Sequence, residues 1–133
     1  MLDPTPTLYR RLGGYDAIAA LVDDLLPRLT SDPQIGVYWK GKCNDSMKKH
    51  RQLVVDFLSC ATGGPADYRG LDMKTSHEGL GISESDWNVF VVHAVAALDD
   101  LGVAEAEKRD FLAAAGSLKG DIVEARQTAD MRA

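Results

Sequence analysis

The chain has 133 residues, of which 45% are hydrophobic and 26% charged, and this composition is typical of a folded globular domain rather than a disordered chain. Its formal net charge is −5 and it has no basic stripe, which argues against nucleic acid as a partner. No apolar run approaches the roughly 20 residues that a membrane span needs, and the N-terminal residues lack the apolar core and cleavage site of a signal peptide.

Helical patterns begin close to the N-terminus. Thr7 is placed to cap a short helix that Gly13-Gly14 end. Asp16 begins a second helix, in which Pro27 removes a backbone donor and is expected to bend or end the helix near its fourth turn. One face of this helix is apolar, and it carries Ile18, Leu21, Val22, Leu25, Leu26 and Leu29.

The middle of the chain predicts a short helix followed by a long one. Asp32-Pro33 resembles a cap followed by a proline in the first turn, so a short helix is expected over residues 34–39. Residues 40–46 are expected to form a loop, with Ser46 as the cap of a helix over residues 47–62. On one face of that helix His50 is the only polar residue beside Met47, Leu53, Val54, Phe57, Leu58 and Ala61.

After Gly63-Gly64-Pro65, residues 63–76 are predicted to be a loop or a very short helix. Ser83 and Asp86 have the spacing of a capping box and begin a helix that Gly102 ends. The last helix is predicted over residues 105–124, and residues 125–133 form a polar tail.

These elements predict one all-α domain over residues 1–133, with about four main helices and no strand pattern. The two cysteines, Cys43 and Cys60, form no CxxC pair. We interpret them as reduced thiols of a cytoplasmic protein.

Three histidines are the candidates for chemistry, because the chain has no HExxH motif, no structural-zinc spacing and no local signature of a catalytic triad. His50 is either a core-edge residue bonded to a neighbour or a polar group that points into an apolar ligand pocket. His77 is either a solvated loop residue or a ligand, since Gly79 and Gly81 would let the backbone pass close to a bulky planar group. His93 is interpreted as structural.

Four stretches carry a resemblance to a known family: LYRRLGG (8–14), VDDLLPRLTSDPQI (22–35), FLSCATGGP (57–65) and YRG-x-x-MKTSHEGLGIS (68–83). In this order and spacing they resemble the truncated haemoglobins, the small two-on-two helical globins, and most closely their first group. The resemblance covers residues 8 to about 124. It implies a two-on-two α-helical sandwich around haem b, iron protoporphyrin IX.

On this resemblance, His77 is the proximal ligand and binds iron through a neutral imidazole, which a second acceptor orients through its other nitrogen. Lys49 and Lys74 are candidates for contacts with the haem propionates. The resemblance places five apolar residues on or near the porphyrin, with simple core packing as the alternative for each: Met73, Leu80, Ile82, Phe90 and Leu118.

The distal side departs from the family. Leu25-Leu26 stand where Phe-Tyr is common, and Leu26 cannot donate to a ligand as the tyrosine does. Val54 replaces a frequent glutamine, and Trp39 replaces a phenylalanine that wedges the haem. His50 then remains as the donor to bound dioxygen, or as a sixth ligand to the iron. The distal residues assigned to the cofactor pocket are completed by Leu53 and Phe57.

The function expected from this resemblance is binding of dioxygen, nitric oxide and carbon monoxide, with possible conversion of nitric oxide to nitrate when an unidentified reductase supplies electrons. One donor in place of two predicts weaker discrimination for dioxygen over carbon monoxide, since a lost donor costs about 1–3 kcal/mol. A redox or gas-sensing protein with His50 and His77 on the iron is the alternative. A peroxidase-like role ranks third, and a helical partner-binding module without haem requires a chance match at His77. We expect a monomer, or a weak oligomer at most.

Overall fold

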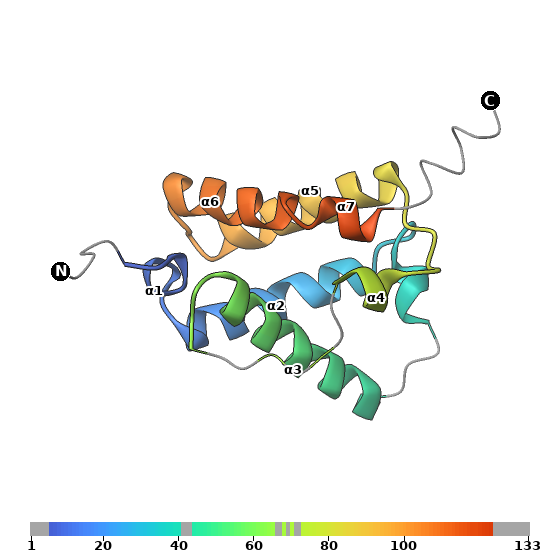
Figure 1. Cartoon of the computed structure of the whole chain (residues 1–133), viewed down its shortest axis with the longest axis horizontal. Helices are drawn as coiled ribbons and strands as arrows, with labels where there is room; N and C mark the ends of the chain where they lie inside the picture. Colours follow the sequence, from blue (N-terminus) through green and yellow to red (C-terminus); the bar gives the residue numbers. More distant parts are fainter. Residues whose placement is uncertain (1–5, 41–43, 66–67, 69, 71–72, 124–133) are drawn as a thin grey trace.

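The structure is a computed structural model that describes residues 6–40, 44–65, 68, 70 and 73–123, and these residues form helices and no strand. The elements in chain order are α1 (Leu8–Leu12), α2 (Tyr15–Thr30), the 3-10 helix η1 (Gly36–Trp39), α3 (Asn44–Ala61), α4 (Met73–His77), α5 (Glu84–Asp100), α6 (Glu105–Gly116) and α7 (Lys119–Ile122). Figure 1 shows two layers, one built on α2 and α3 and the other on α5, α6 and α7. The all-α prediction is confirmed. In the part of the chain that the structure describes, no helix is long and apolar enough to span a membrane.

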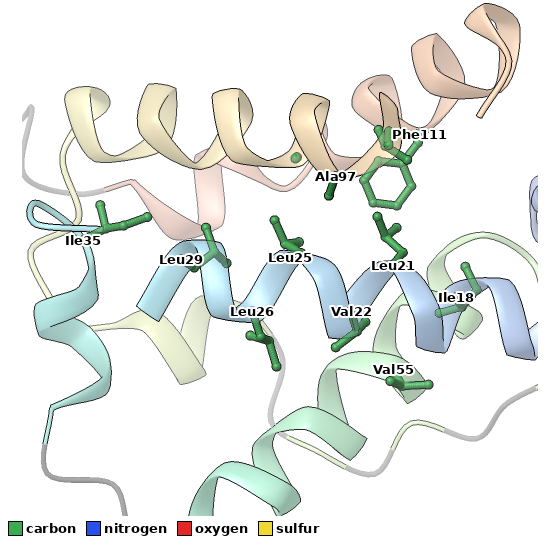
Figure 2. Close-up of a cluster of buried hydrophobic side chains, with 12 residues drawn as sticks. Ile18, Leu21, Val22, Leu25, Leu26, Leu29, Ile35, Val55, Ala97 and Phe111 are labelled. Carbon is green, nitrogen blue, oxygen red and sulfur yellow. The ribbon is translucent and has the colours of Figure 1, made fainter. Parts of the chain in front are cut away.

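Helix α2 lies at the centre of the core and packs on both α3 and α5 (Figure 1). Its six predicted apolar residues are all buried. Figure 2 shows that Leu21 and Leu25 point toward the layer of α5 and α6, whereas Val22 and Leu26 point toward the side of α3 and α4. Because residues three and four apart share a helix face, one helix can supply apolar side chains to both layers.

Helix α3 is only partly buried on its predicted apolar face. It is fully buried at Val55 and Ser59, which lie outside the face that carries His50. On the His50 face, Leu53 remains 41% exposed and Met47 is half-buried. A leucine that remains partly exposed gains only part of the roughly 1.5–3 kcal/mol that full burial would give. This face is therefore suited to covering by an apolar group.

Several helix ends follow the sequence. The side chain of Thr7 accepts a hydrogen bond from the Arg10 amide at 3.2 Å, and α1 ends at Gly13, which has a φ of +119°. Ser83 and Asp86 form the predicted capping box, with both hydrogen bonds at 3.0 Å. Helix α2 continues through Pro27 and ends within one turn of it, as expected of a proline late in a helix.

Two helices begin at other residues than predicted. The short helix begins at residue 36 rather than 34, because the Asp32 carboxylate accepts hydrogen bonds from the amides of Gln34 and Ile35 and holds a turn there. Helix α3 begins at residue 44, so Ser46 lies inside it instead of capping it.

The predicted helix over residues 105–124 is divided into α6 and α7. Helix α6 ends at Gly116, a residue with low helix propensity. The hydroxyl of Ser117 then donates to the Ala114 carbonyl at 2.6 Å, and Leu118 lies between the two helices.

One of the two cysteines can be placed. Cys60 is exposed and its thiol is free. Cys43 and the predicted tail over residues 125–133 lie outside the described residues.

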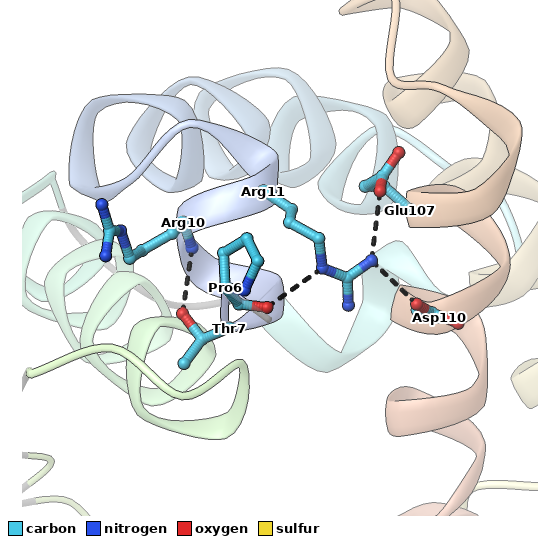
Figure 3. Close-up of polar contacts among 6 residues, drawn as sticks. All are labelled: Pro6, Thr7, Arg10, Arg11, Glu107 and Asp110. Atoms are coloured by element: carbon cyan, nitrogen blue, oxygen red, sulfur yellow. Dashed lines mark hydrogen bonds and ion pairs between the residues drawn. The ribbon is translucent and has the colours of Figure 1, made fainter. Parts of the chain in front are cut away.

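Helix α1 is fastened to α6 by one arginine (Figure 3). The Nη1 atom of Arg11 donates to Glu107 at 3.1 Å and to Asp110 at 3.0 Å, while its Nε donates to the Pro6 carbonyl at 3.3 Å. The interaction joins the N-terminal helix to the opposite layer, about a hundred residues along the chain.

A carboxyl pair between α2 and α5 gives a pH-dependent prediction. A hydrogen bond with Asp24 and the negative charge of that residue raise the pKa of Asp100. Hydrogen bonds from Asp100 and Arg28 lower the pKa of Asp24. Because the folded state favours protonated Asp100, the stability that this proton gives is lost as the pH rises through the raised pKa.

Asp100→Asn should therefore raise the melting temperature of the protein at pH 7, since an amide carries no negative charge beside Asp24. The gain should disappear near pH 3, where the wild-type carboxyl is protonated too. Asp99→Asn is the matched control, because it removes the same charge next door but breaks the ion pair with Lys108, at 2.7 Å, and should give no gain. An equal rise of the melting temperature in both variants would show that the effect comes from net charge alone.

Candidate functional site

His77 is the last residue of the short helix α4, which packs against α7 (Figure 1). Its Nδ1 lies 2.8 Å from the carbonyl oxygen of Met73, one helical turn earlier. A carbonyl can only accept, so Nδ1 carries the proton and the lone pair is on Nε2. This is the tautomer that an imidazole needs in order to bind a metal through Nε2, and the Met73 carbonyl lies where it can orient the ring.

The chain turns sharply after His77. The amide of Leu80 donates to the His77 carbonyl at 3.2 Å, and Gly79 and Gly81 have φ angles of +86° and +72°. A side chain is strained at these angles, so the turn itself requires glycine at both positions. A Cβ at either glycine would meet no protein atom within 4 Å. The structure thus supplies a backbone reason for these glycines beside the close approach proposed from the sequence.

The apolar residues expected near the porphyrin have different environments. Ile82 is buried in a small second core with Trp87 and Val123, so protein packing accounts for it. Phe90 packs on Trp87 with ring centroids 5.3 Å apart and contacts both core clusters. In contrast, Leu80 is 44% exposed, and Met73 and Leu118 are half-buried.

Trp39 and His50 form a hydrogen bond that the sequence analysis missed. The indole Nε1 of Trp39 donates to Nε2 of His50 at 3.1 Å, and the two rings meet edge to face with centroids 6.2 Å apart. An indole nitrogen is only a donor, so Nε2 of His50 is the acceptor and the ring proton is on Nδ1. The sequence could have predicted this hydrogen bond. An indole N–H in an apolar pocket needs an acceptor, and His50 is the single polar residue on the predicted apolar face of the next helix.

Trp39 ends η1, and a polar network holds this short helix to the start of α5. The hydroxyl of Tyr38 donates to the Asp86 carboxylate at 2.6 Å, and the side-chain amide of Gln34 donates to the same carboxylate at 2.7 Å. Burial and the hydrogen bond with Asp86 raise the pKa of Tyr38 to about 12. Burial alone would raise the pKa of Asp86, but hydrogen bonds from Tyr38, Gln34 and Ser83 lower it. The residue before Trp39 is therefore anchored to the opposite layer.

The side chains of Leu26, Val54 and Phe57 carry no hydrogen-bond donor. Leu26 is 8% exposed and points toward the side of α3 and α4 (Figure 2). Val54 is half-buried on α3, and Phe57 packs edge to face on Tyr68 with ring centroids 5.2 Å apart. Lys49 and Lys74 are exposed on α3 and α4, where long cationic side chains can reach carboxylates at the edge of a planar group.

The third histidine has a structural partner. Nε2 of His93 on α5 lies 2.7 Å from the Asp32 carboxylate, which sits in the connection between α2 and η1. The hydrogen bond with His93 and those from the backbone amides of Gln34 and Ile35 lower the pKa of Asp32. This contact joins the two layers and agrees with the structural interpretation of His93.

Together these residues fit a haem. An imidazole in the metal-binding tautomer lies on a short helix, and the partly exposed apolar face of α3 provides surface for a flat hydrophobic group. Haem iron commonly takes its protein ligand from a single histidine. Chemically, the imidazole of His77 is in the form that can bind iron, and the partly exposed face of α3 carries His50, paired with Trp39.

The sequence matches the family of bacterial-like globins over residues 7–124. It is 30% identical to a group 1 truncated hemoglobin of Chlamydomonas moewusii, over 90% of this chain and 73% of that protein. It is also 30% identical to a group 1 truncated hemoglobin of Tetrahymena thermophila, over 75% of this chain and 80% of that protein.

Solved structures show the same fold. The truncated hemoglobin of Tetrahymena pyriformis in its Fe(III) form superposes with a TM-score of 0.82 at 25% identity, over 89% of this chain and 98% of that one. The protein THB1 of Chlamydomonas reinhardtii gives a TM-score of 0.74 at 26% identity, over 92% of this chain and all of that one. The two-on-two helical sandwich expected from the sequence is confirmed.

Proposed function

The chain belongs to the bacterial-like globin family, as a truncated haemoglobin of the first group, and is a haem protein that binds gas ligands; we propose that His77 holds the iron and that dioxygen is the main ligand. One observation supports the assignment of His77 as the iron ligand. The 2.8 Å contact between Nδ1 of His77 and the Met73 carbonyl fixes the tautomer whose Nε2 lone pair can bind iron. When bound, ferrous haem supplies a coordination position at which dioxygen, nitric oxide and carbon monoxide can bind.

The protein's own residues set how that position is used. Leu26 and Val54 make the distal side apolar, which favours uncharged diatomic gases over water and anions. On this side the indole N–H of Trp39 donates to Nε2 of His50, which places the ring proton of His50 on Nδ1. With no tyrosine hydroxyl at position 26, we expect weaker preference for dioxygen over carbon monoxide than a site with two strong donors gives.

The test of dioxygen binding is spectroscopic. The ferrous protein should change reversibly between deoxy and oxygenated absorption spectra as air and argon are exchanged. Immediate oxidation to the ferric form, with no stable oxygenated spectrum, would contradict the proposal.

We extend the proposal to conversion of nitric oxide to nitrate. Each nitrate consumes one nitric oxide, one dioxygen and one electron, so a reductase or another one-electron donor must be a partner. Leu26 and Val54 favour this use, because an apolar distal side admits a second uncharged gas. The oxygenated protein mixed with nitric oxide in stopped flow should yield about one nitrate per haem within the mixing experiment. Displacement of dioxygen by nitric oxide without nitrate formation would contradict this activity. The control is carbon monoxide-saturated protein, which should form no nitrate.

A further inference from the structure

We propose that Trp39 acts as a latch on His50, which keeps this histidine off the haem iron and leaves the distal position open to gases. The inference rests on the proposed function, since it concerns the iron that His77 is proposed to hold. Trp39 is a positioning residue in this scheme, because it acts through His50 and needs no contact with the ligand.

A neutral imidazole has one N–H and one nitrogen lone pair in the plane of the ring. The indole N–H of Trp39 uses the lone pair on Nε2 of His50 at 3.1 Å, and the proton is then on Nδ1. While this hydrogen bond exists, His50 cannot bind iron through either nitrogen. Iron and Trp39 therefore compete for one lone pair.

The fold holds the latch in place. Trp39 follows Tyr38, whose hydroxyl is bonded to Asp86 at 2.6 Å, so η1 is tied to the start of α5. His50 lies on α3, which packs against α2 instead. The hydrogen bond thus joins two separately anchored elements.

The latch also has room to open. Trp39 borders a hollow of about 250 Å³ that it shares with Thr30, Gly36, Lys40 and Met47. The indole can turn toward this hollow, which would release Nε2 of His50.

The experiment compares the deoxy ferrous absorption spectra of wild-type protein, Trp39→Phe and the double variant Trp39→Phe with His50→Ala. We expect a five-coordinate spectrum in the wild type. In Trp39→Phe the ratio of six- to five-coordinate haem should rise about fivefold or more, as loss of a hydrogen bond of ordinary strength predicts, and low-spin bands should become visible. These bands should vanish in the double variant. Trp87→Phe, the same substitution at the chain's other tryptophan, should keep the wild-type spectrum.

A second readout separates this inference from the assignment of His77. Nitrogen-15 spectra of the purified protein saturated with carbon monoxide report the protonation of each His50 nitrogen, whichever residue holds the iron. The wild type should show an unprotonated Nε2, and Trp39→Phe should show a mixture of tautomers. A protonated Nε2 in the wild type would overturn the latch, as would a six-coordinate wild-type spectrum or an unchanged spectrum in Trp39→Phe. Loss of haem binding in the wild type would instead overturn the proposed function.

Discussion

Replacing His77 by alanine is expected to lower the affinity for haem roughly a hundredfold or more and to remove the five-coordinate ferrous spectrum. Changes to residues that only orient a metal ligand already cost about 10–100-fold, and removal of the ligand itself should cost at least as much. Helix α4 has only five residues. Met73 at its start is half-buried and Leu80 after its end is exposed, so packing around α4 offers little substitute for the lost bond. The measurement is a haem titration followed in the Soret band, beside a spectrum of the ferrous product.

Two controls make this result specific to iron ligation. Added imidazole should restore the five-coordinate spectrum of His77→Ala, because the free ring can enter the space that the side chain leaves. His93→Ala should weaken the fold through loss of its contact with Asp32 but should leave the ferrous spectrum unchanged. A normal spectrum in His77→Ala without imidazole would assign the iron to another residue.

The fold was predictable from the sequence wherever one local interaction decides the structure. The capping box of Ser83 and Asp86 needs only two residues three positions apart, and the structure forms it as expected. The apolar face of α2 has the helical period, and every predicted residue on it is buried. The division between α6 and α7 was not predictable in this way, because the apolar pattern continues across Gly116 while the backbone does not.

The site was predictable only in part, because its decisive contacts join distant residues. The proposal that His77 binds iron followed from a family resemblance, which also implied an acceptor for the other ring nitrogen. That this acceptor is the Met73 carbonyl depends on α4 being helical. The bond between Trp39 and His50 depends on how η1 and α3 approach each other, which no local pattern specifies. The sequence therefore suggested His50 as the only donor on this side, because Trp39 was interpreted only as a wedge against the haem.

The second large effect is expected from restoring a hydroxyl at position 26. Leu26→Tyr should slow dissociation of dioxygen about tenfold, because a new hydrogen bond to the partly negative ligand contributes about 1.4 kcal/mol. Figure 2 shows Leu26 pointing away from the layer of α5 and α6, toward the side on which α3 and α4 lie. The measurement is the dioxygen dissociation rate in stopped flow, compared with the carbon monoxide dissociation rate of the same protein.

Leu26→Phe is the matched control, because it introduces an aromatic ring of nearly the same size without the hydroxyl. Both variants enlarge a residue that is only 8% exposed, so both carry the same overpacking penalty of about 1–3 kcal/mol in stability. Only the hydroxyl should affect dioxygen more than carbon monoxide, since carbon monoxide carries little charge when bound. Equal dioxygen dissociation rates in the two variants would show that position 26 does not reach the ligand. A tenfold difference would show that the apolar Leu26 limits retention of dioxygen and that Trp39 and His50 do not replace a tyrosine.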